Sequence, residues 1–258
     1  DFIEAYNNLG TAYESLNQFD KAIKSYKTAL SFNDKFIPAN KNLANLLYKL
    51  DFTDKALKYY EKLNILSPND PSIQHLIKSL KADNAATFNV ADDYVNVEHV
   101  KNVFNSKAEN FDNLLVNELG YNAPLYLLDL LKHKYQKLPR FKKAIDLGCG
   151  TGISGSAFRD ITDYLVGVDI SDEMISVARQ KKIYDELIIG EVNETIHQKR
   201  NTFDLLICTD VFIYIGNLNK IFNNISEYLK NSGLFLFCTE RNDEEIYKLN
   251  TSGRYSHS

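Results

Sequence analysis

The chain has 258 residues, of which 44% are hydrophobic and 25% are charged, and its formal net charge at pH 7 is −4. This composition is that of a globular protein with enough apolar residues for one large domain or two modest ones. The slightly acidic balance disfavours a protein that binds nucleic acid through a concentrated basic patch, and no run of 18 apolar residues is present to span a membrane. The three cysteines form no CxxC pair and have no histidine at metal-site spacing, so we expect reduced thiols, a cytoplasmic protein and no metal.

The first third of the chain repeats with a period of 34 residues. When residues 3–36 are aligned with residues 37–70, small residues fall at Gly10 and Ala44, and aromatic residues fall at Tyr26 and Tyr60. Small residues let two helices approach closely, while large residues at helical spacing fill the remaining gaps. The pattern resembles the tetratricopeptide repeat, in which each unit is a helix–turn–helix. We therefore predict a repeat domain over residues 1–83, with a capping helix over residues 71–83.

Repeats of this type bind peptides or hold proteins together, so the resemblance implies a protein or peptide partner. Lys41 and Asn45 lie one helical turn apart and resemble the start of a carboxylate-binding pattern in some repeat proteins. The later basic positions of that pattern are absent, which favours a solvated helix face. Two full repeats are few for independent stability, and the chain begins inside a helical pattern without a methionine. We expect missing upstream repeats or packing against a second domain, and the oligomeric state stays open.

Residues 84–93 are polar and show no clear period, so we expect a linker that leads to a second domain over residues 94–258. A helical pattern resumes over residues 97–119 and is predicted to end at Gly120. Pro124 is then placed for the first turn of another helix. The second domain is therefore predicted to begin with helices.

Four glycines fall within eight residues of the stretch AIDLGCGTGISG, residues 144–155, directly behind a short apolar run. A second apolar run, YLVGVD, ends in Asp169, and Ser171 is a credible N-cap for the helix that follows. The order strand, glycine turn, helix, strand, acid, helix predicts a doubly wound sheet in which the turn and the acid lie at adjacent strand ends. Glycines permit close backbone approach, and a carboxylate can accept hydrogen bonds from both ribose hydroxyls. The turn is therefore predicted to hold a nucleoside cofactor.

The identity of this cofactor depends on the residues around the glycines. Gly150, Gly152 and Gly155 satisfy the pattern G-x-G-x-x-G, which leaves an NAD-dependent oxidoreductase as an alternative. Asp146 counts against NAD, because a carboxylate before the first glycine would repel a pyrophosphate but could meet the ammonium of a methionine tail. Later apolar runs supply a third, fourth and fifth strand, with an acid after the third and after the fourth. These features favour S-adenosylmethionine.

From about residue 94 onward, the chain resembles a class I S-adenosylmethionine-dependent methyltransferase, which has a seven-stranded Rossmann-like fold. The stretch AIDLGCGTG is similar to its first motif, VGVDIS to its ribose-binding motif, GEVNE to its adenine edge and CTDVFIYI to the motif after strand four. Together with the repeats, the chain resembles a bacterial group of repeat-containing methyltransferases. The resemblance implies an α/β fold with parallel sheet order 3-2-1-4-5, S-adenosylmethionine as the cofactor, and a cofactor site formed by Asp146, Gly148, Cys149, Gly150, Thr151, Gly152, Asp169, Ile170, Met174, Glu191, Val192, Asp210 and Val211. For Met174, a core-facing helix position is the alternative.

The methyl acceptor, a small molecule or a protein, is not identified by the sequence. No Asn/Asp-Pro-Pro-Tyr motif follows the fourth strand, which argues against the common amino-methylating nucleic-acid enzymes. Tyr121, Asp210 and Tyr214 are candidate catalytic residues, and Tyr94 and Phe111 are candidates for the wall of the acceptor site, although each can equally serve packing. A scaffold protein whose cofactor domain does not catalyse is a further alternative.

The end of the chain departs from the family pattern. Only 18 residues follow Glu240, too few for the two strands and the helix that normally complete this sheet. We therefore expect the C-terminal strands to be missing and the fifth strand to lack a partner on one side.

Overall fold

The structure is a computed structural model that describes residues 2–82, 95, 97–192, 194–195, 201–243, 246–250 and 252–258. The expected linker 84–93 and the wall candidate Tyr94 lie outside these described residues. The chain divides into two compact units, one holding residues 1–88 with 250–253 and the other residues 89–249 with 254–258. Among the described residues, no helix is both long and apolar enough to cross a membrane.

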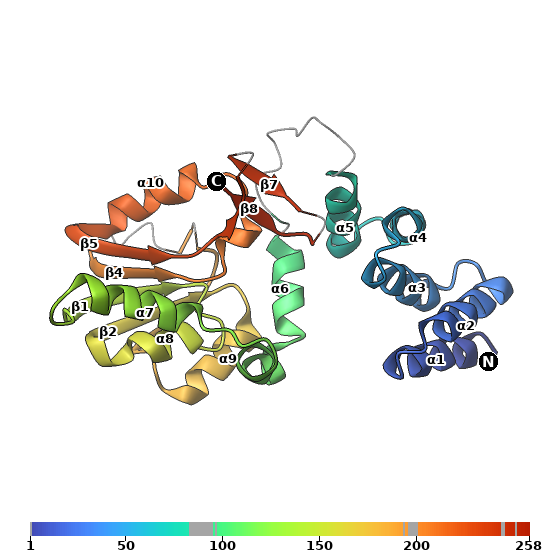
Figure 1. The fold of residues 1–258 in the computed structure, drawn as a ribbon, viewed down its shortest axis with the longest axis horizontal. Coiled ribbons are helices and arrows are strands. Elements are labelled where there is room, and N and C mark those ends of the chain that lie inside the picture. The colour runs from blue at the N-terminus through green and yellow to red at the C-terminus, as the bar shows by residue number, and fades with distance from the viewer. Residues whose placement is uncertain are drawn as a thin grey trace. The chain divides into compact units, whose positions relative to one another are not determined.

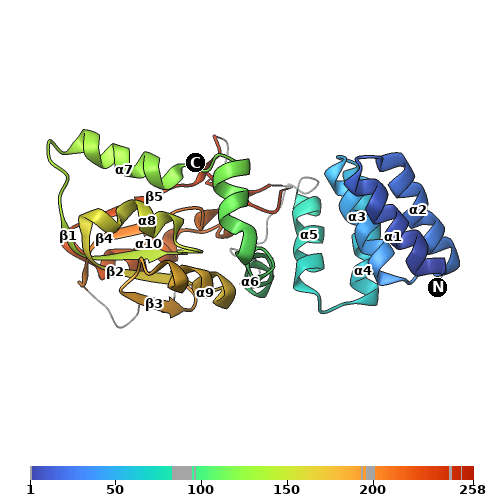
Figure 2. The same ribbon diagram turned by 90° about the horizontal axis from the view of Figure 1, so that it is seen from below.

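Residues 2–82 of the first unit form helices joined by short connections (Figures 1 and 2). Each period of 34 residues produces one pair of packed helices, and a single helix follows the second pair. The helices are α1 (Phe2–Ser15), α2 (Phe19–Phe32), α3 (Ile37–Lys49), α4 (Thr53–Leu66) and α5 (Pro71–Ala82).

Equivalent positions of the two helix pairs make equivalent contacts. Tyr26 and Tyr60 are each only 1% exposed. The Tyr60 hydroxyl donates to Oδ1 of Asn45 at 2.8 Å, and the Tyr26 hydroxyl donates to Oγ1 of Thr11 at 3.3 Å, in both cases 15 residues back along the chain. A Cβ added at Gly10 would lie 2.4 Å from the Tyr26 ring. The small residue predicted at this helix crossing is therefore needed for the aromatic ring to pack.

The second unit contains a parallel sheet with strand order β3-β2-β1-β4-β5. This order confirms the prediction made from the sequence. The central strands read as nearly continuous apolar runs because both of their faces are covered. The strands are β1 (Phe141–Leu147), β2 (Thr162–Asp169), β3 (Glu186–Ile189), β4 (Phe203–Cys208) and β5 (Leu229–Phe237).

Helices cover both faces of this sheet. On one face, α7 (Ala123–Lys134) and α8 (Ile153–Phe158) pack against Ala144 and Leu205. On the other face, α10 (Asn219–Tyr228) packs against Ile145. The register pairs Leu147 of β1 with Val168 of β2, so the two strands end at the same level. Their carboxyl ends therefore meet at one edge of the sheet.

The segment before α7 differs from its prediction as one continuous helical stretch. It is broken after α6, where the Ser106 hydroxyl donates to the backbone carbonyl of Val103 at 2.9 Å and competes with the helical hydrogen bonds. The predicted end at Gly120 is consistent with the positive φ of that residue, 64°, and Pro124 lies in the first turn of α7, as predicted. The resulting elements are α6 (Val97–Asn105), η1 (Ala108–Asn110) and η2 (Asn113–Glu118).

Three short strands after β5 form a sheet of their own instead of extending the main sheet. Its order is β6-β8-β7, with β6 (Glu240–Arg241), β7 (Tyr247–Leu249) and β8 (Tyr255–His257). Tyr255 is 1% exposed, and Nε2 of His257 lies 2.8 Å from the carbonyl oxygen of Ile215. The described end of the chain is thus packed against the loop after β4.

Candidate functional site

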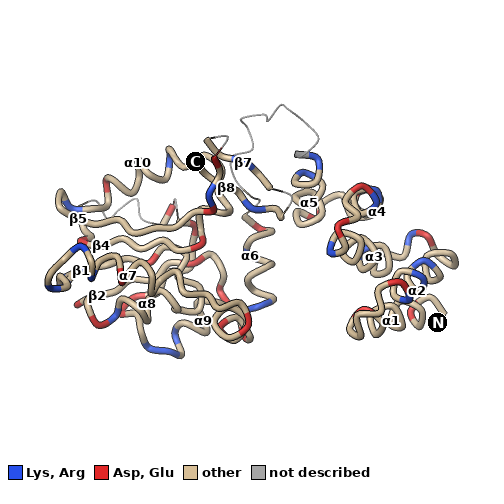
Figure 3. Tube along the Cα trace, viewed as in Figure 1, with Lys and Arg blue, Asp and Glu red and all other residues tan. Residues whose placement is uncertain are grey.

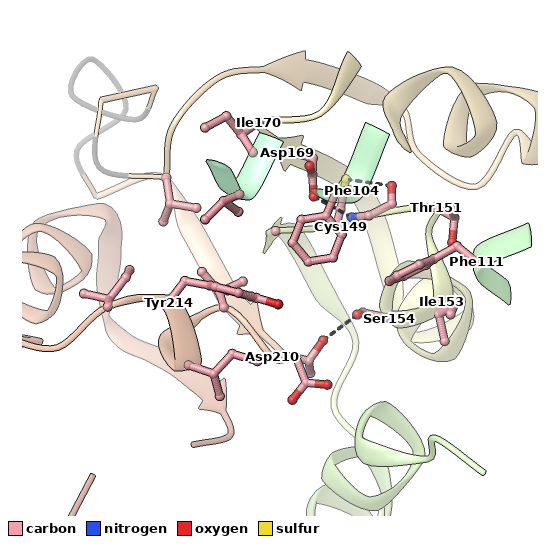
Figure 4. A pocket seen from close by; sticks show the side chains of 18 of the residues that line it. Phe104, Phe111, Cys149, Thr151, Ile153, Ser154, Asp169, Ile170, Asp210 and Tyr214 are labelled. Atoms are coloured by element: carbon pink, nitrogen blue, oxygen red, sulfur yellow. Dashed lines mark hydrogen bonds between the residues drawn. The ribbon is translucent and has the colours of Figure 1, made fainter. Parts of the chain in front are cut away.

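A cavity in the second unit opens at the carboxyl ends of the parallel strands, where ligands bind in doubly wound folds (Figure 4). Its wall combines the glycine turn after β1, the end of β2, the loops after β3 and β4, and the segment before α7. Asp and Glu residues lie at this edge of the sheet, and along both described units Lys and Arg residues are interspersed with Asp and Glu (Figure 3). The predicted residues that line the cavity are Phe111, Tyr121, Gly148, Cys149, Gly150, Thr151, Asp169, Ile170, Glu191, Val192, Asp210, Val211 and Tyr214.

The glycine turn is shaped by its backbone. Gly148 and Gly150 have φ values of 71° and 52°, in the left-handed region that glycine enters without steric cost. The backbone N–H groups of Gly148 and Cys149 both donate to the Val168 carbonyl, at 2.8 and 2.9 Å, and join the turn to β2. A Cβ at Gly148 would lie 2.1 Å from Cγ2 of Val211. The first glycine is therefore required both by its conformation and by the neighbouring loop.

Cys149 lies inside this turn and is 3% exposed. Burial raises the pKa of its thiol well above the ordinary value, and the nearby Asp146 carboxylate adds to this effect. A thiol that stays protonated is a poor nucleophile. Cys149 is therefore suited to fill space in the turn and not to attack a substrate.

Asp169, the last residue of β2, is held by two different loops. Its Oδ2 accepts a hydrogen bond from the Gly150 backbone N–H and its Oδ1 accepts one from the Ser171 backbone N–H, both at 2.8 Å. Burial raises the pKa of this carboxyl group, and the two backbone donors partly offset the rise. Each oxygen keeps a further lone pair, so the carboxylate can accept two adjacent hydroxyl groups of one ligand.

The residues beyond β2 and β3 form an adjoining part of the wall. Ile170, Glu191 and Val192 line it, and the Gly190 backbone N–H donates to the Asp169 carbonyl at 2.9 Å. Ser171 caps α9 (Asp172–Lys181) as predicted, with its side chain accepting a hydrogen bond from the Met174 backbone N–H at 3.1 Å. This part of the wall offers apolar side chains and one carboxylate, which suits a flat heterocycle with an amino group.

The end of β4 brings polar groups together on the far side of the cavity. Asp210 has a positive φ of 55°, which is uncommon for a residue other than glycine and is concentrated at functional sites. Its backbone N–H donates to the Cys238 sulfur at 3.3 Å. The Tyr121 hydroxyl faces Thr209 and Asp210, and burial together with the Asp210 charge raises the Tyr121 pKa. Tyr121 therefore remains a neutral hydroxyl at ordinary pH.

Aromatic side chains from separate segments close the cavity. The Phe104 ring packs edge-on against Phe111 and Tyr214, with ring centroids 5.8 and 5.6 Å apart. In the view of Figure 4, the Phe104 and Tyr214 rings lie between Asp169 and Asp210. Cavity-lining residues that the sequence did not single out include Val97, Val100, Phe104, Leu115, Thr209 and Arg254.

A weak signal for part of this wall is present in the sequence. Val97, Val100 and Phe104 are spaced by three and four residues, so one face of α6 carries all three. Arg254 has no such signal, because it reaches the cavity only through the small sheet at the end of the chain. Its Nη1 lies 3.3 Å from Oε1 of Glu240.

Three residues expected at the cofactor do not line the cavity. Asp146 is fully buried and accepts a hydrogen bond from the Tyr184 hydroxyl at 2.7 Å, because strand alternation turns it beneath the glycine turn. Met174 is also fully buried, so its position agrees with the alternative of a core-facing helix residue. Gly152, with φ 97°, serves as the residue before α8, and a Cβ there would lie 3.2 Å from the Tyr184 ring. Their predicted contacts with a ligand stay predictions, and none of the three is among the residues that line this cavity.

The environment of Asp146 is electrostatically unusual. Burial raises the pKa of Asp146 to about 7, the hydrogen bond from Tyr184 opposes the rise, and the Asp169 charge adds to it. The Tyr184 ring lies where side chains at Gly155 and Gly167 would otherwise stand, since Cβ atoms there would fall 2.4 and 3.0 Å from its nearest ring atoms. The acid and the ring thus form a packed layer that supports the turn from below.

Comparison with known proteins gives matches in both units. The family model of a methyltransferase domain matches residues 140–256, and that of the tetratricopeptide repeat matches residues 3–36. An 18S rRNA (guanine-N(7))-methyltransferase of Bos taurus is 37% identical over 76 residues, which are 30% of this chain and 27% of the relative. A ubiquinone biosynthesis O-methyltransferase of Coxiella burnetii is 25% identical over 137 residues, 51% of this chain and 58% of the relative.

The chain thus spans about a quarter of the length of the first curated relative and somewhat more than half the length of the second. A solved complex of DhpI with SAH is 16% identical, covers 63% of this chain and 79% of the other, and has a TM-score of 0.48. The match over residues 140–256 includes the glycine turn, Asp169 and the loops after β3 and β4. The chain therefore contains a methyltransferase domain that follows a tetratricopeptide repeat, as the two resemblances in the sequence imply.

Proposed function

We propose that this protein is an S-adenosylmethionine-dependent methyltransferase. The observation that carries the proposal is the arrangement of Asp169, whose two oxygens are held by backbone N–H groups from two loops at 2.8 Å while the carboxylate lines the cavity. Such a carboxylate suits the paired hydroxyls of a ribose. The methyltransferase domain match supports S-adenosylmethionine over other nucleosides.

The cavity residues fit this cofactor in three parts. The turn from Gly148 to Thr151 would hold the methionine tail, Asp169 the ribose, and Ile170 with Glu191 and Val192 the adenine. S-adenosylmethionine supplies a methyl group that its positive sulfonium has already activated. The protein then contributes mainly the alignment of the acceptor with that methyl group.

Asp210 is the best placed of the three catalytic candidates. Its exposed carboxylate lines the cavity on the side opposite Asp169, next to the Tyr121 hydroxyl. An acceptor with an O–H or N–H group could pass its proton to an Asp210 oxygen, while Tyr121 and Tyr214 orient it. Because no described residue of 2–82 lines the cavity, the role proposed for the repeat unit is binding a protein or peptide partner.

Isothermal titration of the full chain with S-adenosylhomocysteine and with NAD tests the proposal. We expect S-adenosylhomocysteine to bind and NAD not to bind. Asp169→Ala should weaken the binding of S-adenosylhomocysteine by about 100-fold, because two hydrogen bonds to a charged acceptor are lost. Asp163→Ala is a matched control, because this exposed acid lies at the other end of β2 and pairs with Arg140. Binding of NAD alone, or of neither ligand, would contradict the proposal.

A further inference from the structure

The part of the cavity wall formed by residues 97–118, here named the acceptor wall, is attached to the elements that would hold the cofactor. It comprises α6, η1 and η2, and it presents Phe104, Phe111 and Leu115 to the cavity. Polar contacts join it to α9 and to the glycine turn. We propose, on the basis of the methyltransferase function above, that Asp112 is a positioning residue that couples the cofactor turn to the acceptor wall.

Asp112 connects two elements that are distant in the sequence. Its Oδ1 accepts a hydrogen bond from the Thr151 hydroxyl in the glycine turn, and its Oδ2 accepts one from the Lys181 ammonium in the last turn of α9. The Asp112 side chain is 44% exposed and that of Lys181 27% exposed, so the ion pair itself is partly screened by water. The hydroxyl of Thr151 is more sheltered, because that residue is only 1% exposed.

Three further contacts hold the acceptor wall at the other end of α9. The ammonium of Lys101 lies 3.0 Å from Oδ1 of Asp172, and the Asn105 amide group donates to the same oxygen at 3.4 Å. The Ser171 hydroxyl donates to Oδ1 of Asn105 at 2.6 Å. These contacts attach α6 to the first turn of α9. The contact through Asp112 joins the wall to the glycine turn instead.

Phe111, the residue before Asp112, explains why the contact between Asp112 and Thr151 matters for the cavity. The Phe111 ring lies over the turn, 3.8 Å from the place where a Cβ at Gly150 would stand. When a ligand orders the turn, the Thr151 hydroxyl is fixed, and Asp112 then holds Phe111 over the cavity. Because coupling free energies are reciprocal, a wall that is released from the turn should also weaken binding of the cofactor.

Hydrogen exchange of the full chain, with and without S-adenosylhomocysteine, tests the coupling. In the wild type, the ligand is expected to slow exchange both in the turn, residues 148–153, and in the wall, residues 108–118. In Asp112→Ala, protection of the turn should persist, protection of the wall should be lost, and the dissociation constant should rise about three- to tenfold. A purely structural role would alter the wall equally with and without the ligand.

Two variants make the test specific. Asp129→Ala removes an exposed ion pair with Lys132 inside α7 and should behave as the wild type. Lys181→Met breaks the ion pair but leaves the Thr151 contact, so most of the ligand-induced protection of the wall should remain. If Lys181→Met loses as much protection as Asp112→Ala, coupling through the turn is overturned.

The two proposals fail in different ways. A wild type that does not bind S-adenosylhomocysteine would contradict the methyltransferase function itself. Two other outcomes would overturn only the role of Asp112. In the first, the wild type binds S-adenosylhomocysteine but its acceptor wall gains no protection from hydrogen exchange. In the second, the ligand protects the acceptor wall of Asp112→Ala as much as that of the wild type.

Discussion

The two sides of the cavity are built in different ways. The side that we propose binds the cofactor, here named the cofactor side, depends on main-chain geometry, since the backbone N–H groups of Gly148, Cys149 and Gly150 all donate hydrogen bonds to β2 residues. The side that we propose binds the acceptor, here named the acceptor side, depends on side chains from separate segments, among them Phe104 in α6 and Tyr214 after β4, whose rings touch edge to face. The first arrangement is local and the second arises only in the folded chain.

This difference predicts how each side responds to substitution. Main-chain geometry allows few alternatives, because a side chain in a left-handed turn adds strain and occupies space that a neighbour already fills. Packed aromatic rings can be replaced by other apolar groups at a modest cost. The cofactor side should therefore tolerate little change, while the acceptor side can vary and so change which acceptor fits.

Gly148→Ala should have the largest effect of the substitutions that compare the two sides. The new Cβ would lie 2.1 Å from Cγ2 of Val211, and φ at this position is 71°. We expect the free energy of unfolding to fall by about 3 kcal/mol. Titration with S-adenosylhomocysteine should show binding weakened by at least about 100-fold, because the turn must move to relieve the clash.

Gly120→Ala provides the matched control for conformational strain alone. Gly120 has a similar φ of 64°, but a Cβ there meets nothing within 4 Å. Urea unfolding should show a cost of about 1 kcal/mol with unchanged ligand binding. Equal effects at Gly120 and Gly148 would mean that close packing against Val211 plays no part in the site.

Asp146→Asn should change how stability depends on pH. The pKa of Asp146 is raised from 3.8 to about 7 by burial, so between these pH values the folded state holds a proton that the unfolded state has lost. The free energy of unfolding therefore falls as pH rises through this range, by at most about 1.4 kcal/mol per pH unit. Asp146→Asn removes this contribution, and its stability relative to the wild type should increase from pH 5 to pH 7 and level off above it.

Tyr184→Phe sharpens the same measurement. The Tyr184 hydroxyl lowers the pKa of Asp146 by hydrogen bonding, so its removal should shift the sensitive range to higher pH. Urea unfolding at pH 5, 6, 7 and 8 would measure both variants. A slope that still remains in Asp146→Asn is expected from Asp169, whose pKa burial also raises. Parallel pH profiles of Asp146→Asn and the wild type would show that Asp146 does not titrate in this range.

The sequence predicts the cofactor side well because its determinants are local. Four glycines behind an apolar run and an acid at the end of the next run predict the turn and the place of Asp169 at an adjacent strand end, both of which the structure contains. The strand order, which the family resemblance implies, is also present. The repeat period likewise aligns Tyr26 with Tyr60, and in the structure both hydroxyl groups donate to a residue 15 positions back along the chain. In each case a steric or hydrogen-bonding requirement falls on residues that are close in the chain or related by a fixed period.

The remaining features require the fold. Phe104 and Arg254 line the same cavity although they lie near opposite ends of the second unit's sequence, and no spacing pattern connects them. Asp146 was expected at the ligand because it precedes the first glycine, but its place in the alternation of β1 turns it toward Tyr184. Asp112 has an ordinary sequence context, and its link to Thr151 becomes visible only once the segment before α7 is positioned.

Among the proposed substitutions of cavity-lining residues, Phe104→Ala should have the smallest effect on cofactor binding. It removes edge-on contacts with Phe111 and Tyr214 but leaves every hydrogen bond of the turn and of Asp169 in place. We expect the affinity for S-adenosylhomocysteine to change less than about threefold and the free energy of unfolding to fall by about 2 kcal/mol. Calorimetric titration measures the affinity, and urea unfolding measures the free energy of unfolding.

Phe222→Ala is the matched control, because Phe222 is also partly exposed and packs on Phe212, Phe235 and Phe237 outside the cavity. It should lower stability by a similar amount with no effect on the ligand. If Phe104→Ala instead weakens binding as strongly as Asp169→Ala, the rings are part of the cofactor site itself. The division between a main-chain side that holds the cofactor and a side-chain wall that selects the acceptor would then fail, and acceptor choice could not evolve independently of cofactor binding.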